Sequence, residues 1–214
     1  MHARTEESGD LANHSALNRQ GLHRAEVRGH VKVVQYLLDK EADIELPDEN
    51  SCGLIYLAVA GGHEDVVDLF LSKGSTANAT NDADKTPLHE AAHKGYVQIL
   101  RLLVAGGADV AASDDTGRST IHYAAIADTE GAMQFLLEEG EDDERKDHFG
   151  WTAWHWVAMS DCDAVAKLLL EHRKSVYEGI DNYGQTALDW AIERRHEKVV
   201  NIWEQDVFYD AQAD

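Results

Sequence analysis

The fold is decided by the stretch Lys85-Thr86-Pro87-Leu88-His89-Glu90-Ala91-Ala92-His93-Lys94-Gly95-Tyr96. Its first residues favour the start of a helix, because the hydroxyl of Thr86 can cap the first turn and Pro87 suits a position whose backbone needs no donor. Gly95 favours the end of that helix, where a left-handed residue is common. Apolar residues then recur at helical spacing as far as Gly107-Ala108-Asp109-Val110: Val97, Ile99, Leu100, Leu102 and Leu103. The stretch therefore predicts two consecutive helices joined by a short turn.

The same pattern returns along nearly the whole chain. Aligned on Leu88, equivalent apolar residues, here called anchors, follow one another at intervals of 33, 33, 33, 33 and 34 residues: Leu22, Ile55, Leu88, Ile121, Trp154 and Leu188. A fixed period of this length is typical of repeat arrays, in which each unit buries its apolar face against its neighbours. The sequence thus predicts six stacked units with one continuous core.

The Thr-Pro-Leu-His sequence, the helical spacing and the Gly-Ala-Asp ending resemble the ankyrin repeat. The resemblance implies an all-α solenoid of about six helix-turn-helix repeats joined by β-hairpin loops, over residues 19–205. Residues 1–18 form an N-terminal segment, and its Ser8-Gly9-Asp10-Leu11 sequence makes it a candidate remnant of a preceding repeat. Residues 206–214 are expected to be a polar C-terminal tail.

Repeats one, four and five depart from the pattern, and repeat one has Gln20-Gly21 in place of threonine and proline and Glu41 in place of the glycine that ends its second helix. Repeat four has Asp128-Thr129 where glycine and histidine are expected, and repeat five has Arg173-Lys174-Ser175 in place of its second glycine. Because helix ends favour glycine, we expect local distortion around repeats four and five.

The amino-acid composition limits the classes of partner that the protein is expected to bind. The 214 residues include 19 Lys and Arg against 40 Asp and Glu, a formal charge of −21. Such a charge repels nucleic acid and anionic membranes, so we expect neither as a partner and favour a basic or apolar protein segment. The two cysteines, Cys52 and Cys162, suggest no disulfide framework. With no signal sequence or membrane span recognised, we expect an intracellular monomer, cytoplasmic or nuclear.

The sequence indicates no metal site and no cofactor. Seven of the twelve histidines occupy repeat positions, one or two to a repeat, so they cannot converge on one ion: His23, His30, His63, His89, His122, His155 and His196. In the family that the chain resembles, the first-helix histidines bond to the backbone between repeats. The acidic run 138–144 does not match a calcium loop, and we interpret it as a solvated acidic loop, with a docking site for basic residues as the alternative. No catalytic motif is present.

The resemblance places a binding surface on the concave face, formed by the hairpin tips and the first helices. Tyr123, Trp156 and Trp190 occupy one equivalent position in repeats four to six, with Ile126 and Met159 one turn later. Exposed aromatic residues with a methionine are typical of interface hot spots, although such rings also pack in cores. The predicted partner-binding residues are Arg24, Leu57, Glu90, His93, Arg118, Tyr123, Ile126, Trp151, Trp156, Met159 and Trp190.

Two functions follow from this surface. The leading hypothesis is a non-enzymatic protein-interaction module, acting as a scaffold, adaptor or regulatory subunit that binds a peptide or domain in its concave groove. The alternative is a small-molecule-binding protein or enzyme on the same face, in which Glu90, His93 and Tyr123 serve as acid and base groups. A closed pocket at the aromatic end would favour the alternative, and an open groove would favour the module.

Overall fold

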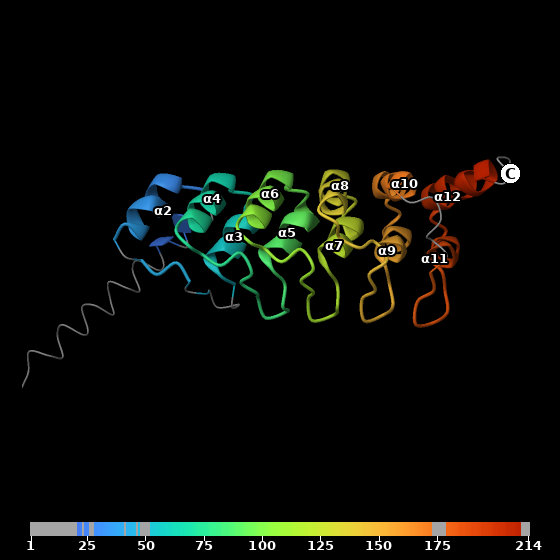
Figure 1. The fold of residues 1–214 in the computed structure, drawn as a ribbon, viewed down its shortest axis with the longest axis horizontal. Coiled ribbons are helices and arrows are strands. Elements are labelled where there is room, and N and C mark those ends of the chain that lie inside the picture. Colours follow the sequence, from blue (N-terminus) through green and yellow to red (C-terminus); the bar gives the residue numbers. More distant parts are fainter. Residues whose placement is uncertain are drawn as a thin grey trace, which may run out of the picture.

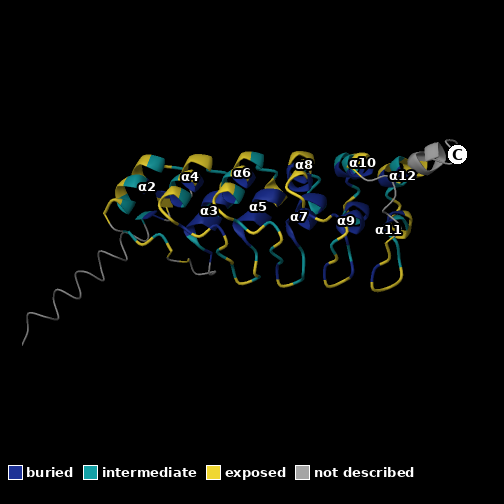
Figure 2. Ribbon diagram, viewed as in Figure 1, coloured by how far each residue is buried: buried dark blue, intermediate teal, exposed yellow. Residues whose placement is uncertain are grey.

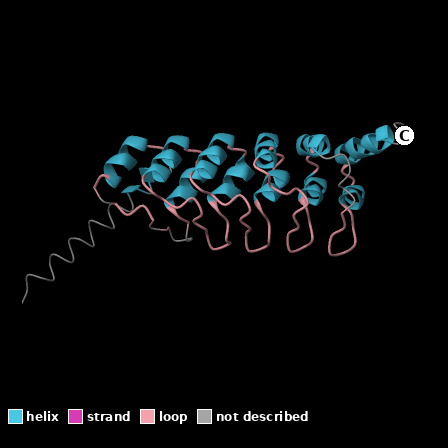
Figure 3. Cartoon of the chain, viewed as in Figure 1, coloured by secondary structure: helices cyan, strands magenta, loops and turns pink. Residues whose placement is uncertain are grey.

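The chain forms a row of helix pairs with loops projecting to one side (Figures 1 and 3). The computed structural model describes residues 21–22, 24–25, 28–40, 42–45, 47, 52–172 and 179–210, and their side chains as far as residue 204. The predicted segment 1–18 lies outside these residues. So does Arg173-Lys174-Ser175, where distortion was expected.

The helices lie in two layers, as Figure 1 shows. The inner layer consists of α3 (Leu54–Ala60), α5 (Pro87–Lys94), α7 (Thr120–Ile126), α9 (Ala153–Ser160) and α11 (Ala187–Arg194). The outer layer consists of α2 (Val31–Leu38), α4 (Glu64–Ser72), α6 (Val97–Ala105), α8 (Glu130–Glu138), α10 (Asp163–His172) and α12 (Glu197–Asp210). From α3 onward each helix contacts the other helix of its repeat, and every described helix contacts the equivalent helix of a neighbouring repeat, as a solenoid requires.

The repeat residues begin the inner helices as predicted. The Thr86 hydroxyl accepts the backbone N–H of His89, and His89 Nδ1 accepts the backbone N–H of Thr86 at 3.0 Å. Because Nδ1 accepts, Nε2 carries the proton and donates to the carbonyl of Ala112 in the next hairpin, at 3.1 Å. His122 and His155 repeat the arrangement. The expectation that these histidines bond to the backbone between repeats is therefore confirmed for all three.

Small residues bring the inner helices together. Ala92, Ala125 and Ala158 are fully buried where consecutive inner helices meet, whereas Ile192, their equivalent in the last repeat, is exposed. The burial map in Figure 2 shows the core as a band between the two layers. Trp154 is an anchor buried in this core, as predicted, and its ring lies against Trp203, with the ring centroids 5.8 Å apart.

The all-helical solenoid is confirmed. Within the described ranges there is no strand, only isolated bridges in two hairpins, Ser113 to Ser119 and Ile180 to Thr186. Helix α12 continues to Asp210, so the segment that we expected as a tail from residue 206 begins as helix. None of the described helices is long and apolar enough to span a membrane. No group of three or more potential metal ligands is found in the described part of the chain.

The expected distortion at Asp128 does not occur. Asp128, with φ 53°, adopts the left-handed conformation of Gly95, with φ 71°, and α8 follows it as α6 follows Gly95. The Asp128 carboxylate accepts the backbone N–H of Val165 at 2.9 Å, a bond to the first turn of α10 that offsets the conformational strain.

Asp161 has the same left-handed backbone conformation, but its buried Oδ1 accepts, from the described part of the chain, no hydrogen bond like the one that Asp128 accepts from Val165. Its φ is 53°, and its Oδ1 is buried with no hydrogen-bond partner among the described residues. We expect Asp161→Gly to raise the free energy of unfolding by about 1–2 kcal/mol, because glycine removes both penalties. Chemical denaturation followed by circular dichroism measures the change. Asp128→Gly is the matched control, and its gain should be smaller because the bond to Val165 is lost. A loss of stability in Asp161→Gly would contradict this account.

Candidate functional site

Each hairpin of repeats three to six is held by one side chain, seven residues before the anchor. Its Oδ1 accepts the backbone N–H groups of the residues two and four positions later, at 2.8–3.1 Å, in Asn81, Asp114, Asp147 and Asp181. Such short-range bonds from Asn and Asp stabilise tight turns. The four side chains therefore fix the hairpins that border the concave face.

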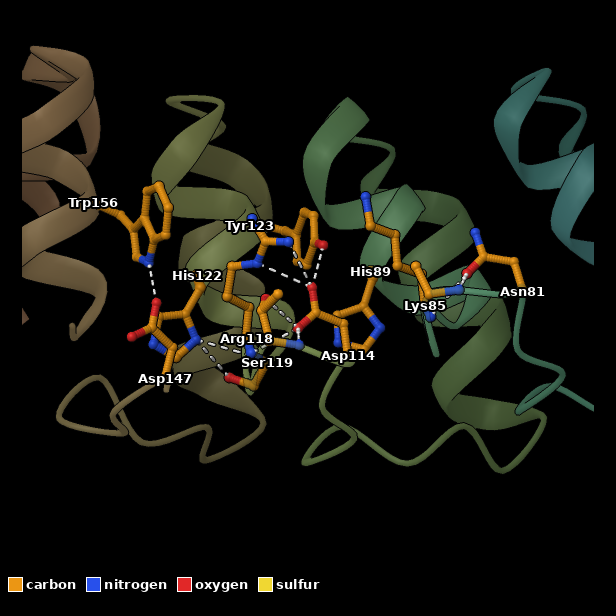
Figure 4. A network of polar contacts seen from close by, with 12 residues as sticks. Asn81, Lys85, His89, Asp114, Arg118, Ser119, His122, Tyr123, Asp147 and Trp156 are labelled. Atoms are coloured by element: carbon orange, nitrogen blue, oxygen red, sulfur yellow. Dashed lines mark hydrogen bonds and ion pairs between the residues drawn. The ribbon is translucent and has the colours of Figure 1, made fainter. Parts of the chain in front are cut away.

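In repeats four to six the second carboxylate oxygen holds an aromatic side chain of the inner helix. The pairs, each nine residues apart, are the Tyr123 hydroxyl to Asp114 Oδ2 at 2.6 Å, Trp156 Nε1 to Asp147 Oδ2 at 3.1 Å, and Trp190 Nε1 to Asp181 Oδ2 at 2.9 Å. Figure 4 shows the first two pairs side by side. Each carboxylate thus ties a hairpin to the aromatic residue of its own repeat.

The three aspartates were missed by the sequence reasoning, although the sequence carries a signal for them. Aspartate precedes the anchor by seven residues wherever the residue two after the anchor is Tyr or Trp, and both can donate a hydrogen bond. Repeat three has Asn81 with Glu90 instead, which avoids placing two carboxylates together. Pairing the two positions within each repeat would have revealed the network.

Trp151, Trp156 and Trp190 form an aromatic cluster between repeats five and six. The ring centroid of Trp151 lies 4.9 Å from that of Trp156 and 5.3 Å from that of Trp190, both edge to face. Trp151 Nε1 also donates to Asp181 Oδ2, at 3.0 Å. Edge-to-face packing and satisfied N–H groups fix the orientation of the rings. The cluster is therefore rigid, and all three residues remain partly accessible.

Cations lie against the aromatic rings. The Arg118 guanidinium carbon is 5.3 Å from the Tyr123 ring centroid and 5.8 Å from that of Trp156, and Arg118 pairs with Asp114 at 2.9 Å. Lys85 Nζ lies 4.9 Å from the Tyr123 centroid. Contacts of this kind contribute about 0.5–2 kcal/mol each. With the aromatic cluster, these side chains form one connected strip across repeats three to six: Lys85, Arg118, Tyr123, Trp151, Trp156 and Trp190.

Electrostatics keep the Asp114–Tyr123 pair in one protonation state. Burial alone would raise the pKa of Asp114, but the hydrogen bonds from Tyr123, Thr116 and Arg118 hold it well below its usual range. Burial, together with the bond to Asp114, raises the pKa of the Tyr123 hydroxyl well above its usual value. The aspartate therefore stays ionised and the tyrosine stays a neutral donor.

Of the predicted partner-binding residues, Arg118, Tyr123, Trp151, Trp156 and Trp190 lie in this strip. Among all the predicted partner-binding residues, Arg24 and His93 are exposed. The half-buried residues are Leu57, Glu90, Arg118, Ile126, Trp151, Trp156, Met159 and Trp190. Arg24 and Leu57 belong to repeats one and two, away from the aromatic cluster. The strip itself joins residues of repeats three to six.

Tyr123 differs from the expectation. We predicted an exposed ring, but Tyr123 is only 5% exposed. Lys85 and Arg118 both lie over its ring, while its hydroxyl donates to Asp114. The Tyr123 ring therefore packs under the cations of the strip and is not accessible to a partner.

The bond from Tyr123 to Asp114 also bears on the enzyme alternative, in which Glu90, His93 and Tyr123 would act together as acid and base groups. The ring centroids of His93 and Tyr123 are 6.1 Å apart, but the Tyr123 hydroxyl is occupied by Asp114. Glu90 accepts the hydroxyl of Tyr56 at 3.2 Å and lies 3.8 Å from Lys94. Burial and Glu90 together raise the pKa of Tyr56. Among the described residues, no hydrogen bond joins Tyr123 to Glu90 or His93.

Comparison with known proteins agrees with this architecture. Two family models of ankyrin repeats match, one described as three copies at residues 54–147 and 127–203, and one described as many copies at residues 22–71. No curated protein matches the sequence. An ankyrin repeat domain from Acinetobacter baumannii AYE has a similar fold, with a TM-score of 0.75 and 20% identity over 86% of this chain and 96% of that one. Ankyrin repeats generally mediate protein–protein interaction and are generally non-enzymatic. The chain belongs to the ankyrin-repeat family.

Proposed function

We propose that repeats four to six bind a protein partner in the concave groove, with Trp156 and Trp190 as the main contacts and Ile126 and Met159 beside them. The observation that carries this proposal is the fixed orientation of the indoles. Trp156 and Trp190 already bond to Asp147 and Asp181 through their N–H groups, so a partner meets apolar ring surface and need not satisfy a buried donor.

Rigidity also favours binding. A side chain that is ordered before association loses little conformational entropy on binding, which for a mobile side chain costs about 0.5–1.5 kcal/mol. Large aromatic side chains surrounded by smaller apolar contacts dominate the binding energy of many interfaces. Trp156, Trp190 and Met159 are only partly buried, so their surface is available to a partner.

The test is a pull-down with quantitative mass spectrometry that compares the wild type with two groove variants. Trp156→Ala removes a main contact, and Met159→Glu places a charge beside the rings while leaving the indole–aspartate bonds intact. We expect both to lose the same captured protein, with at least a tenfold decrease in recovery. Tyr36→Ala is the control, because Tyr36 is 61% exposed on the outer helix α2, away from the groove.

Circular dichroism must show that the groove variants remain folded at the temperature of the experiment. A partner whose recovery is the same with wild type and Met159→Glu would contradict the groove assignment. A partner lost only with Tyr36→Ala would place binding on the outer helices instead.

A further inference from the structure

The hairpin tips of repeats three to six form one continuous row. Consecutive hairpins are joined by backbone bonds, from Asp115 N–H to the Ala83 carbonyl at 3.1 Å, from His148 to Thr116 at 3.0 Å, and from Asn182 to Phe149 at 3.1 Å. In Figure 1 the loops lie side by side along the edge opposite the outer helices. The spacing of packed helices, about 8–10 Å, gives the row a length of about 30 Å over its three intervals.

One half of the row is acidic. Asp82 and Asp84 lie at the hairpin tip of repeat three and Asp115 lies at that of repeat four, and all three are exposed. Among the described residues none of these three carboxylates forms an ion pair. The nearby cations have other contacts, because Lys85 lies over Tyr123 and Arg118 pairs with Asp114. The three carboxylates outnumber the one cation, Lys85, that has no carboxylate partner, so this half carries a net negative charge.

The other half, here called the apolar half, exposes three apolar side chains. Phe149, at the tip of repeat five, is 47% exposed, and Ile180 and Tyr183, in the hairpin of repeat six, are 53% and 72% exposed. Exposed apolar residues that occur singly need no explanation, but a contiguous group marks an interaction site. The Phe149 ring also lies 6.1 Å from that of Trp151, which connects the tips to the aromatic cluster of the groove.

Hydrogen bonds hold the two hairpins of the apolar half together in the free protein. Lys146 Nζ donates to the Ile180 carbonyl at 2.8 Å, and Asn182 Nδ2 donates to the His148 carbonyl at 3.0 Å. These bonds link the hairpins of repeats five and six, in addition to the bond from Trp151 to Asp181. The exposed rings therefore stand on a fixed platform, which lowers the entropy lost on binding.

We propose that this row docks one extended segment of the protein partner, with Lys or Arg over the hairpins of repeats three and four and apolar or aromatic side chains over those of repeats five and six. The inference rests on the proposed function. It adds the chemistry of the partner segment and the order of its basic and apolar parts along the row. The centres of the two halves are two repeats apart, about 20 Å, which an extended chain covers in about six residues.

A random-peptide display library selected on the full chain tests the proposal. Asp82→Lys/Asp115→Lys reverses the charge of the acidic half and leaves the left-handed Asp84 in place. Asp68→Lys/Glu138→Lys is the matched control, since both residues are exposed on outer helices and the charge change is equal. Phe149→Ser/Tyr183→Ser removes the exposed rings, and Met159→Glu tests the groove separately.

On the wild type, we expect enrichment of peptides with two or more Lys or Arg about six residues from an apolar pair. On the charge-reversed variant, acidic residues should replace the basic ones while the apolar pair remains, and peptides selected on the wild type should bind at least tenfold more weakly. The matched control should change affinity by less than about twofold. Phe149→Ser/Tyr183→Ser should abolish the apolar preference and retain the basic one.

The outcomes separate the two proposals. One outcome would overturn this inference and leave the groove function standing: the enriched peptides lose binding to Met159→Glu but bind both pairs of tip variants as they bind the wild type. If no peptide is enriched, or if peptides bind the wild type and every variant alike, both proposals fail. A charge reversal that weakens binding no more than the matched control would limit the role of charge to a long-range effect and overturn the acidic half of the row.

Discussion

Asp114→Ala is expected to lower the free energy of unfolding by about 3–4 kcal/mol. The carboxylate is buried and accepts from the backbone N–H groups of Thr116 and Arg118, from the Thr116 hydroxyl, from the Arg118 side chain and from the Tyr123 hydroxyl. Alanine leaves the buried tyrosine hydroxyl without an acceptor and removes the turn bonds. Denaturant unfolding followed by circular dichroism and tryptophan fluorescence measures the loss.

Two variants separate the parts of this effect. Asp115→Ala removes the adjacent exposed carboxylate and should change stability by less than about 0.5 kcal/mol. Asp114→Asn keeps an acceptor for the turn, as Asn81 does in repeat three, and should lose about half as much as alanine. A loss below about 1 kcal/mol in Asp114→Ala would show that the carboxylate does not hold the hairpin to the inner helix.

Glu141→Ala is expected to stabilise the protein by about 3 kcal/mol at pH 8 and by much less at pH 5. Glu141 is 9% exposed, and neither carboxylate oxygen has a hydrogen-bond partner among the described residues. Burial raises its pKa to about 7, because the nearby Ser119 hydroxyl, which does not form a hydrogen bond of good geometry with it, and the charge of Arg145 lower the pKa by less, and Asp109 and Asp142 raise it slightly further. Alanine occupies the equivalent position, Ala108, in the preceding repeat.

The direction of the pH dependence follows from the raised pKa. Between the ordinary glutamate pKa of 4.5 and the folded-state value of about 7, the folded protein holds a proton that the unfolded chain has released. The free energy of unfolding of the wild type therefore falls as the pH rises through this window and levels off above it. The alanine variant lacks the penalty, so the difference between the two proteins grows over the same window.

Chemical denaturation of both proteins at pH 5, 6, 7 and 8 tests this prediction. The buried histidines also affect stability near the lower end, because burial lowers the pKa of His89 to about 4, but they are present in both proteins and cancel in the difference. Glu139→Ala, in an exposed neighbour, is the control and should show no such window. A stability difference independent of pH would mean that Glu141 is ionised throughout.

The sequence predicted the fold well because the fold depends on local signals repeated at a fixed period. Thr86, Pro87 and Gly95 each act within one or two helical turns, and Leu88 recurs at equivalent anchors. Even Trp154, unusual for an anchor, was correctly placed in the core by its register alone. The position of Asp128 was also identified, although its conformation was misjudged, since aspartate tolerates the left-handed region better than most residues.

The site was predicted less completely, because it depends on contacts between a hairpin and a helix. Tyr123, Trp156 and Trp190 share one register, yet only Tyr123 is buried. Two cations lie over the Tyr123 ring, Arg118 of its own repeat and Lys85 of the preceding one, whereas a single arginine lies over the ring of Trp156 and of Trp190. The placement of the exposed Phe149 and Tyr183 along one row likewise depends on the backbone bonds between hairpins, which the sequence does not show.

The bond between Asp114 and Tyr123 lies within one repeat, and so do its counterparts in the next two repeats. A gene duplication that copied any one of these units would copy its aspartate and its aromatic residue together, and the new unit would fold with its own support. Trp151 is different, because it donates to Asp181 of the following repeat. Exchange or insertion of a unit at that junction would break the bond, just as it would break the bond from Tyr56 to Glu90 between repeats two and three, so the order of the repeats is constrained in evolution at such junctions.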